Sequence, residues 1–338
     1  MAEKWYRTTG RDSDVVISTR VRLARNLKGL PFPRLMSDEQ RQKLNMQVKD
    51  AVKSSRELSS MDYLELANVP KNELISMVER HIISPDFARD PKGRALLLSP
   101  DESISIMIGE EDHLRIQVMK AGLSLDEAWS IADKTDSVLS SKLDYAFSEK
   151  LGFLTACPTN LGTAMRASVM IHLPASEKDG SLRRISESIS KLGLVIRGMY
   201  GEGSGSKAAI YQLSNQETLG VCEKDTLKKL EGIIAQILKI ERSGRERFLS
   251  SEEVEDSVWR ALGILKTARR LSGDEFCSLF SAIRLAVASG RITDISLDRL
   301  SELFVNAQPA TLMCIEKRDM TAAQRDSVRA AMVRNALN

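Results

Sequence analysis

Three consecutive acidic residues, Glu110, Glu111 and Asp112, separate two segments in which apolar residues alternate, residues 103–108 and 114–118. Alternation with a period of two predicts a strand on each side and a turn between them. Carboxylates placed this closely repel one another, so they need a cation to face. Two interpretations stay open. The acids form a solvated hairpin tip, as charge runs usually do, or they face a cation of the protein or of a bound molecule.

A second group of chemically suitable side chains lies in residues 15–26, which begin as a strand. Arg20 and Arg22 fall on one face of an extended segment, with Ser18 on the same side. Guanidinium planes bind phosphate oxygens in pairs, so this arrangement suits a phosphate group. A charged edge strand facing solvent is the alternative that these residues leave open.

Two turn-rich loops could complete a site. Residues 155–163 contain Cys157, which is a reactive thiol only beside a cation and is otherwise a small buried apolar residue. Residues 197–206 contain four glycines. Such a loop can bind phosphate through its backbone amides or close over a site, although many glycine-rich loops are only linkers. Its one acid, Glu202, becomes important if it meets Glu111.

Composition sets limits on the class of protein. A chain of 338 residues with 42% apolar content can bury a full core and suggests about two domains. The net charge is +3, aromatic residues make up 5%, and no basic block with interleaved aromatics occurs, which argues against a nucleic-acid or membrane partner. No apolar run approaches the roughly 20 residues of a membrane span, and the first residues have no apolar leader.

The four cysteines are far apart and form no closely spaced pair, so neither a zinc site nor a disulfide framework is expected. They are Cys157, Cys222, Cys277 and Cys314. A reducing, cytoplasmic location is the simplest interpretation.

The elements that must position these residues mix strands and helices up to about residue 245. Ser37 with Gln40, and Ser124 with Glu127, are predicted capping boxes at the starts of two helices. His81 either caps a helix or stacks on a base, and His172 is predicted to be a core histidine with satisfied ring nitrogens. Predicted helices cover residues 72–80, 123–143 and 181–192, with Gly193 just after the last, and predicted strands cover residues 94–98, 166–173, 194–196 and 210–213. From residue 225 onward the pattern is helical only.

Five segments, in this order, resemble the signature blocks of the guanidino (phosphagen) kinases, and together they are far more specific than any one alone. They are Ser18-Thr-Arg-Val-Arg22, Glu110-Glu-Asp-His-Leu-Arg115, Cys157-Pro-Thr-Asn-Leu-Gly-Thr163, Arg166-Ala-Ser-Val169 and Arg197-Gly-Met-Tyr-Gly-Glu202. Phosphagen kinases carry a helical domain before the first block and have no helical extension after residue 245. The short front, the added tail and the run Arg325-Asp-Ser-Val-Arg-Ala330 are similar to the bacterial protein-arginine kinases (McsB family).

This resemblance implies an α+β fold. A phosphagen-kinase-like catalytic domain, with an antiparallel sheet flanked by helices, is expected at residues 1–245. An all-helical domain for phosphoarginine binding and dimerisation is expected at residues 246–338. The implied activity is transfer of the γ-phosphoryl group of ATP to arginine side chains of proteins, with Mg²⁺ held mainly by phosphates and water.

The resemblance also implies partners. Proteins with exposed arginines are the substrates, and their marking leads to degradation through an AAA+ unfoldase and silences a stress-gene repressor. A zinc-binding activator and a second copy of the chain are further expected partners.

The chemistry of arginine explains why two acids are needed. A protonated guanidinium has no lone pair for attack on phosphorus, so a kinase must orient it and remove a proton. By resemblance, Glu111 is the catalytic base, Glu202 clamps the other side of the guanidinium, and Cys157 tunes the site. The positions that the resemblance assigns to ATP are Ser18, Thr19, Arg20, Val21, Arg22, His81, Arg115, Arg166, Ala167, Ser168, Val169, Met170, Arg197, Gly198, Met199, Tyr200 and Gly201.

A third set of residues lies in the helical tail. Arg325, Asp326 and Arg329 share one helix face at spacings of three and four. On spacing alone they form an intrahelical ion pair. By resemblance they read phosphoarginine, with the acid facing the guanidino nitrogens and the arginines facing the phosphate.

Two positions depart from the family pattern. Gly109 stands where relatives usually have Asn, which questions how rigidly the neighbouring acids are held. Gly205-Ser206 lacks a following acid, which suggests a looser glycine-rich loop. Two alternative functions remain open: a kinase for free arginine or a similar guanidino compound, and a weakly active adaptor that binds phosphoarginine.

Overall fold

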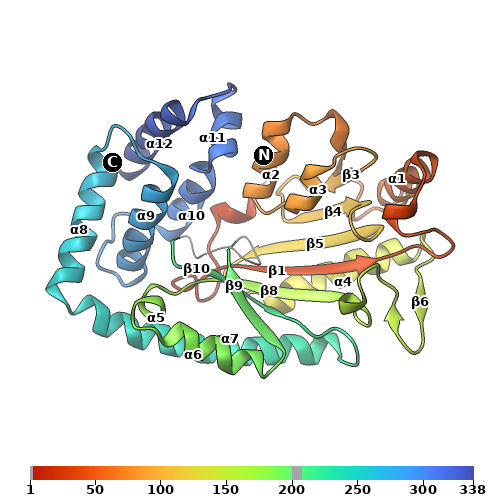
Figure 1. Ribbon diagram of the computed structural model, residues 1–338, viewed down its shortest axis with the longest axis horizontal. Helices are drawn as coiled ribbons and strands as arrows, with labels where there is room; N and C mark the ends of the chain where they lie inside the picture. The colour runs from red at the N-terminus through yellow and green to blue at the C-terminus, as the bar shows by residue number, and fades with distance from the viewer. Residues whose placement is uncertain (1–2, 200–207) are drawn as a thin grey trace.

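One eight-stranded sheet, antiparallel throughout, forms the centre of the first two thirds of the chain (Figure 1). The computed structural model describes residues 3–199 and 208–338. The strand order is β2-β3-β4-β5-β1-β8-β10-β9, and β6 and β7 form a separate hairpin. The strands are β1 Val16–Arg25, β2 Asp62–Glu65, β3 Ala95–Leu98, β4 Ile104–Ile108, β5 Leu114–Ala121, β6 Phe147–Ser148, β7 Gly152–Phe153, β8 Met165–His172, β9 Leu194–Gly198 and β10 Ile210–Asn215.

Strand β1 lies in the middle of the sheet, between β5 and β8. Arg22 is opposite Gln117 on β5 and Arg166 on β8, and Arg20 is opposite Ser168. The alternative of a solvent-facing edge strand is therefore wrong. Because side chains alternate along a strand, these arginines share one face of the sheet, as the sequence predicted.

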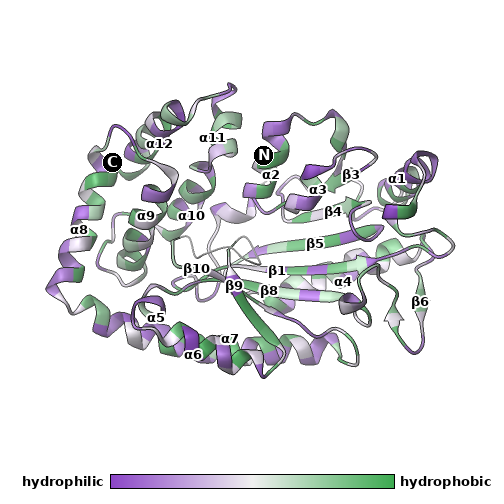
Figure 2. Cartoon of the chain, viewed as in Figure 1, coloured by the Kyte–Doolittle hydropathy of each residue, from purple (hydrophilic) through white to green (hydrophobic). Residues whose placement is uncertain are grey.

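The opposite face of the sheet is apolar and is covered by helices. Helices α1, α4, α6 and α7 contribute the apolar side chains that pack against it in one continuous core. Apolar and polar residues alternate along α7, which runs beneath the sheet in Figure 2. Helix boundaries in this part of the chain are α1 Asp38–Lys53, α2 Lys71–Glu79, α3 Pro85–Arg89, α4 Leu125–Ser140, α5 Pro174–Lys178, α6 Ser181–Ser190 and α7 Glu223–Leu249.

The predicted helix ends are partly confirmed. The Ser37 and Gln40 capping box at the start of α1 is present. The second capping box is wrong, because the Ser124 hydroxyl donates to the Ala121 carbonyl and does not cap α4. Gly193 adopts the expected left-handed conformation (φ +67°), but α6 ends earlier than predicted, at Ser190.

Helix α2 ends in a C-terminal capping motif that places His81. The His81 amide donates to the Val78 carbonyl (3.0 Å) and the Ile82 amide to the Met77 carbonyl (2.8 Å). His81 itself has a φ of 60°, which is the left-handed position that closes such a motif. The capping interpretation of His81 is therefore confirmed, through its backbone.

The last third of the chain is helical, as predicted. Its buried side chains form a second apolar cluster that extends to Met170, Met199 and Ile210 in the part of the chain that contains the sheet. The helices are α8 Glu252–Thr267, α9 Gly273–Ala288, α10 Leu297–Asn306, α11 Pro309–Glu316 and α12 Ala322–Leu337. The predicted boundary at residue 245 falls inside α7, close to its end at Leu249. Each helix within the described ranges is too short or too polar to span a lipid bilayer.

Candidate active site

Arginines from four strands of the sheet line one of its faces, which is polar. Arg20 and Arg22 come from β1, Arg115 from β5, Arg166 from β8 and Arg197 from β9. The residues of adjacent strands that lie opposite one another share a face, so this grouping follows from the pairing of β5, β1, β8, β10 and β9. The sheet thus concentrates positive charge on one surface.

Arg20 and Arg22, at the centre of this face, form no ion pair with an acid among the described residues. Arg20 donates to two uncharged groups, Ser168 Oγ (3.3 Å) and Gln212 Oε1 (2.6 Å). Burial and the nearby charges of Arg115 and Arg166 lower the pKa of Arg20 to about 10. The Nε of Arg22 is buried without a hydrogen-bond partner among the described residues. Such a group attracts an anion, because an anion relieves the mutual repulsion of the guanidinium groups.

Arg166 extends the same electrostatic pattern. Burial, followed by the charges of Arg197 and Arg115, lowers its pKa, while Cys157 and Glu111 act in the opposite direction. Arg166 is therefore close both to other arginines of this face and to Cys157 and Glu111, the two side chains that the sequence singled out.

The acidic turn between β4 and β5 is not a solvated tip. Glu110 is 6% exposed and pairs with Arg115, and Asp112 is 2% exposed. One oxygen of Asp112 accepts from the Asn26 side-chain amide (2.6 Å) and from the Ala156 backbone amide (2.7 Å). The expectation of a facing cation is confirmed for Glu110, and Asp112 ties the turn to two other loops.

Glu111 is the acid that these contacts leave available. It is exposed, and among the described residues its carboxylate accepts no hydrogen bond and forms no ion pair. Burial of part of the carboxyl and the charge of Asp112 raise its pKa, against the influence of Arg115 and of the nearby Arg34. A raised pKa brings a carboxylate closer to the range in which it accepts a proton effectively.

The loop at residues 155–163 forms another wall of the site. Cys157 is partly exposed, and its Sγ lies 3.0 Å from Thr159 Oγ1. The Thr155 hydroxyl donates to the Cys157 carbonyl (2.8 Å), which holds the turn in shape. The alternative of a small buried apolar residue is wrong for Cys157, because the side chain borders open space beside Arg166.

A cleft of about 600 Å³ brings most of these residues together. Its lining residues are Arg22, Leu23, Ala24, Glu111, Arg115, Cys157, Pro158, Thr159, Asn160, Ala164, Met165, Arg166, Arg197, Gln216, Glu217, Thr218 and Leu219. The segment 216–219 was missed by sequence reasoning, since it has no motif and reaches the cleft only because β10 ends there. Arg34 was missed for the same reason, because it lies in a short segment far from any recognised block.

Several positions expected at the nucleotide have side chains on the other face of the sheet. Val21, Ala167 and Val169 belong to the apolar core, and Thr19 is fully buried with its hydroxyl donating to the Gly122 carbonyl (2.7 Å). The expectation that these four side chains contact the nucleotide is therefore corrected. Each is one residue away from a residue that faces the cleft side of the sheet, and so points to the opposite side.

Other expected nucleotide positions lie beside the cleft. Ser18 and Ser168 are on the arginine face but are each 2% exposed. His81 and Met170 border a separate small cavity together with Arg284. Gly198 ends β9, and Met199 is 3% exposed within the C-terminal apolar cluster. Tyr200, Gly201 and Glu202, like Gly205 and Ser206, lie outside the described residues.

The Gly109 departure has a structural explanation. Its φ is +80°, and its amide donates to the His113 carbonyl (2.9 Å) to close the acidic turn. Both glycine and asparagine adopt left-handed conformations readily. Gly109 therefore suits this turn, and the asparagine that the family resemblance leads one to expect would suit it as well.

The motif in the helical tail is arranged differently from the expectation. Arg329 is 2% exposed, and its guanidinium donates to the Ala307 and Leu271 carbonyls and to Asp326 (2.9, 2.8 and 2.9 Å). The intrahelical ion pair is confirmed. Direct contact of Arg329 with a phosphate is not supported, because its side chain is buried and its Nε and Nη1 donate inside the fold. Arg325 is partly exposed and donates to the Met320 carbonyl (2.8 Å).

Metal binding by protein side chains alone is not evident in the parts of the chain that are described. No group of three or more His, Cys, Asp or Glu side chains there could hold an ion. A divalent cation that arrives with a phosphate ligand would meet the cleft arginines and the carboxylates of Glu111 and Glu217.

The comparisons with known proteins agree with this geometry. Residues 43–244 match the family described as ATP:guanido phosphotransferase, C-terminal catalytic domain, and residues 251–338 match the protein-arginine kinase McsB C-terminal domain. The chain is 41% identical over 336 residues to a protein-arginine kinase of Halothermothrix orenii, covering 99% of this chain and 96% of that one. It is 43% identical over 331 residues to one of Caldanaerobacter subterraneus, covering 97% and 98%.

Solved structures show the same fold in the catalytic part. A duplicated taurocyamine kinase from Schistosoma mansoni with bound transition state analog components aligns with a TM-score of 0.63 and 28% identity, over 72% of this chain and 36% of that one. A lombricine kinase aligns with a TM-score of 0.62 at 23% identity, over 72% of this chain and 71% of that one. With this fold and near full-length similarity, the chain belongs to the protein-arginine kinases, whose catalytic domain is that of the ATP:guanido phosphotransferases.

Proposed function

We propose that this protein transfers the γ-phosphoryl group of ATP to arginine side chains of other proteins. One observation carries the proposal: two arginines that form no ion pair with a described residue, Arg22 and Arg166, meet the exposed carboxylate of Glu111 in one cleft. Phosphoryl transfer depends mainly on alignment and on neutralising phosphate charge. The relatives named protein-arginine kinases support the same activity.

In this proposal the polar face of the sheet holds the nucleotide. Arg20, Arg22 and Arg166 lack carboxylate partners among the described residues and therefore bind the phosphates, together with Arg115 and Arg197. Mg²⁺ enters with ATP and is held chiefly by phosphate oxygens and water. His81 contributes near the nucleotide from the end of α2. The phosphates thus lie at the inner end of the cleft.

Glu111 acts at the other end, where the guanidinium of the protein substrate enters. It orients this group and takes a proton from the attacking nitrogen. That nitrogen forms a bond to the γ-phosphorus, the bond from phosphorus to the bridging oxygen breaks, and ADP leaves. Glu202 is proposed, on the family resemblance, to clamp the far side of the guanidinium. Cys157 tunes the site beside Arg166 and forms no covalent intermediate.

The helical tail is proposed to read phosphoarginine and to mediate a homodimer. Asp326 faces the guanidino nitrogens and Arg325 the phosphate, while Arg329 holds Asp326 in position through its 2.9 Å ion pair. The proposed catalytic and helical units meet near the end of α7. Product binding in the tail would let marked proteins influence activity elsewhere in the molecule.

Cellular roles follow the family. We propose a cytoplasmic enzyme whose marks direct proteins to an AAA+ unfoldase and silence a stress-gene repressor, with a zinc-binding activator as a further partner. These partners rest on the resemblance of the sequence blocks.

One assay tests the activity and its alternatives. The full chain is incubated with Mg-ATP and either a casein-like protein or free arginine, and acid-labile phosphate is located by mass spectrometry. Phosphate on protein arginines is the expected result, and Glu111→Gln should remove it. Phosphate only on free arginine would replace the proposal with a metabolite kinase. If neither the protein nor free arginine is phosphorylated, but the chain still binds phosphoarginine, the chain would be an adaptor and not a kinase.

A further inference from the structure

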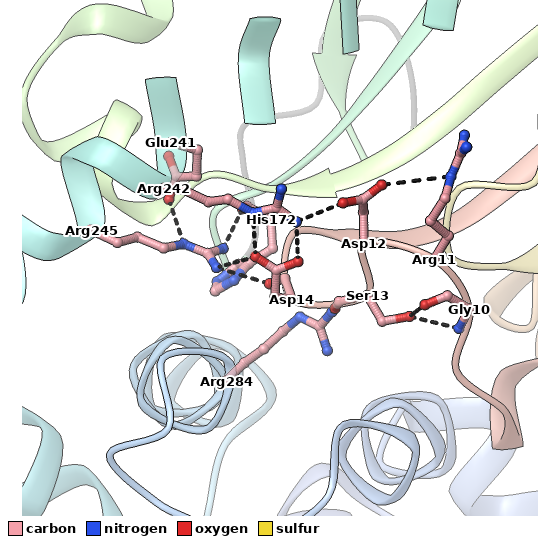
Figure 3. Close-up of polar contacts among 10 residues, drawn as sticks. All are labelled: Gly10, Arg11, Asp12, Ser13, Asp14, His172, Glu241, Arg242, Arg245 and Arg284. Carbon is pink, nitrogen blue, oxygen red and sulfur yellow. Dashed lines mark hydrogen bonds and ion pairs between the residues drawn. The ribbon is translucent and has the colours of Figure 1, made fainter. Parts of the chain in front are cut away.

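A buried charge cluster lies where the C-terminal helices meet the main chain that leads into β1 (Figure 3). Arg245 of α7 and Arg284 of α9 are 4% and 1% exposed. Arg245 donates to the carbonyl of Asp14 (3.0 Å), and Arg284 donates to the carbonyl of Ser13 (2.8 Å). Two buried guanidinium groups from opposite sides of the junction therefore hold consecutive peptide groups.

The same cluster reaches β8, the strand of Arg166. Arg245 also donates to the carbonyl of His172 (3.1 Å), and the His172 amide donates to the Val15 carbonyl (2.8 Å). The Nε2 of His172 lies 2.9 Å from the Ser281 hydroxyl of α9, while its Nδ1 has no partner among the described residues. His172 is buried as predicted, but only one ring nitrogen is satisfied. Two of the strands that carry the arginines of this face, β1 and β8, are thus fixed at this end.

The pairing of β1 with β8 contains an irregularity at this point. Val16 is opposite Ile171, whereas Ser18 is opposite Met170, so Ile17 is an extra residue in the ladder. Side chains alternate with a period of two, so loss of this bulge would shift the register by one residue. Arg20 and Arg22 would then face the apolar core. Their place in the cleft depends on this bulge.

The C-terminal domain contacts the bulge directly. Ile17 packs against the C-terminal apolar cluster, and Arg284 binds the main chain a few residues earlier. Arg245 is neutralised by Glu241 at 3.0 Å. Arg284 forms no ion pair with a described residue, and its Nε has no partner there. Burying a charge that has no ion-pair partner costs free energy, so stability alone does not explain Arg284.

We propose that Arg284 is a positioning residue for the nucleotide site, acting from the C-terminal domain. By binding the Ser13 carbonyl it keeps the bulge at Ile17 and so keeps Arg20 and Arg22 on the cleft face. This inference rests on the proposed function, because it assigns those two arginines to the phosphates of ATP. The C-terminal domain then contributes to ATP binding, although no described C-terminal side chain lines the cleft.

The variant Arg284→Met tests this role, because it keeps the volume of the side chain and removes the donors. We expect the thermal midpoint to stay near that of the wild type, while the Kd and KM for ATP rise about tenfold, since small displacements of binding groups have large effects. The Kd and KM for ATP of Arg284→Lys should lie between those of the wild type and those of Arg284→Met. The control is Arg260→Met on α8, whose exposed side chain pairs with Asp256 and should leave every value unchanged.

Amide hydrogen exchange gives a measurement that does not depend on ATP. Residues 18–22 should exchange faster in Arg284→Met than in the wild type or in Arg260→Met. A folded Arg284→Met with wild-type ATP affinity and wild-type exchange would overturn the inference. If that variant does not fold, Arg284→Lys decides by the same two measurements. A wild-type chain that binds no ATP would overturn the proposed function instead, whatever the exchange rates are.

Discussion

The carboxylate of Glu110 and the guanidinium of Arg115 face each other as a two-point pair, with both oxygen–nitrogen distances at 2.6 Å. Glu110 also accepts a hydrogen bond from the Ser84 hydroxyl. The first acid of the turn is therefore engaged in an ion pair. Asp112 accepts hydrogen bonds from the Asn26 side chain and the Ala156 amide. The three adjacent acids therefore have different tasks: the outer two hold the turn, and the middle one enters the cleft.

Substitutions at adjacent acids should separate catalysis from stability. Glu111→Gln should lower kcat by about a hundredfold or more, because a general base contributes this much or more, while leaving the affinity for ATP and the unfolding free energy nearly unchanged. The measurements are steady-state kinetics, calorimetric titration with ATP and urea denaturation. A large loss of ATP affinity would contradict the role of Glu111 as base.

Asp112→Asn is the matched control, one residue along the chain and equally conservative in shape. It should lower the unfolding free energy by about 1–3 kcal/mol, because a buried carboxylate that accepts two hydrogen bonds is replaced by a group that cannot serve both as well. Unchanged stability in urea denaturation would show that the turn is held by other contacts.

The thiol in the cleft gives a second prediction. Alkylation of Cys157 should block transfer, because a bulky group would fill the space between Arg166 and Glu111, whereas Cys157→Ser should keep most of the activity and resist the reagent. Cys222 is the control, since it is exposed and lies outside the cleft. Complete loss of activity in Cys157→Ser, with the fold intact, would point to a covalent role.

Local patterns predicted the strand faces well and the long-range contacts poorly. The period of two in β1 placed Arg20 and Arg22 together, and the same period around Glu111 predicted the acidic turn. No local pattern reveals that Asn26 pairs with Asp112, because that contact depends on which strands become neighbours. The bulge at Ile17 is hidden for the same reason, since an extra residue is defined only against its partner strand.

Spacing also failed to separate two uses of the same motif. Asp326 and Arg329 lie three residues apart on a helix, which suits an ion pair and a ligand site equally. The carbonyls of Ala307 and Leu271, which come from other segments, accept from the Nε and Nη1 of Arg329 and hold this side chain inside the fold. Helix periodicity carries no information about such neighbours.

The left-handed backbone of Gly109 gives a third prediction. Gly109→Asn should keep activity and cost less than about 1 kcal/mol, while Gly109→Val should cost about 1–3 kcal/mol, because a β-branched residue is strained at positive φ. A Cβ at this position has no neighbour closer than 3.9 Å, so steric contact does not confuse the comparison. Equal stabilities of the two variants in urea denaturation would be inconsistent with this explanation.

The fourth prediction concerns the loss of stability at low pH, and it follows from the three histidines of the chain. Burial lowers the pKa of His81 to about 3, and burial is also the main cause of the lowered pKa of His113 and of His172. The unfolded chain binds protons at these groups below its ordinary pKa of 6.5, while the folded protein does not. Stability is therefore fully present above pH 6.5 and is lost as the pH falls towards the folded values.

The size of this pH effect on the unfolding free energy can be tested at one residue, His172. Each such histidine contributes about 1.4 kcal/mol per pH unit to the slope of the unfolding free energy below pH 6.5. His172→Gln removes one titrating group but keeps a side chain that can bond to Ser281. Between pH 6 and 5, urea denaturation should therefore show a shallower decline for this variant than for the wild type, by about that amount. Parallel declines would mean that His172 binds a proton in the folded protein, in spite of the two arginines, Arg245 and Arg284, whose charges oppose it.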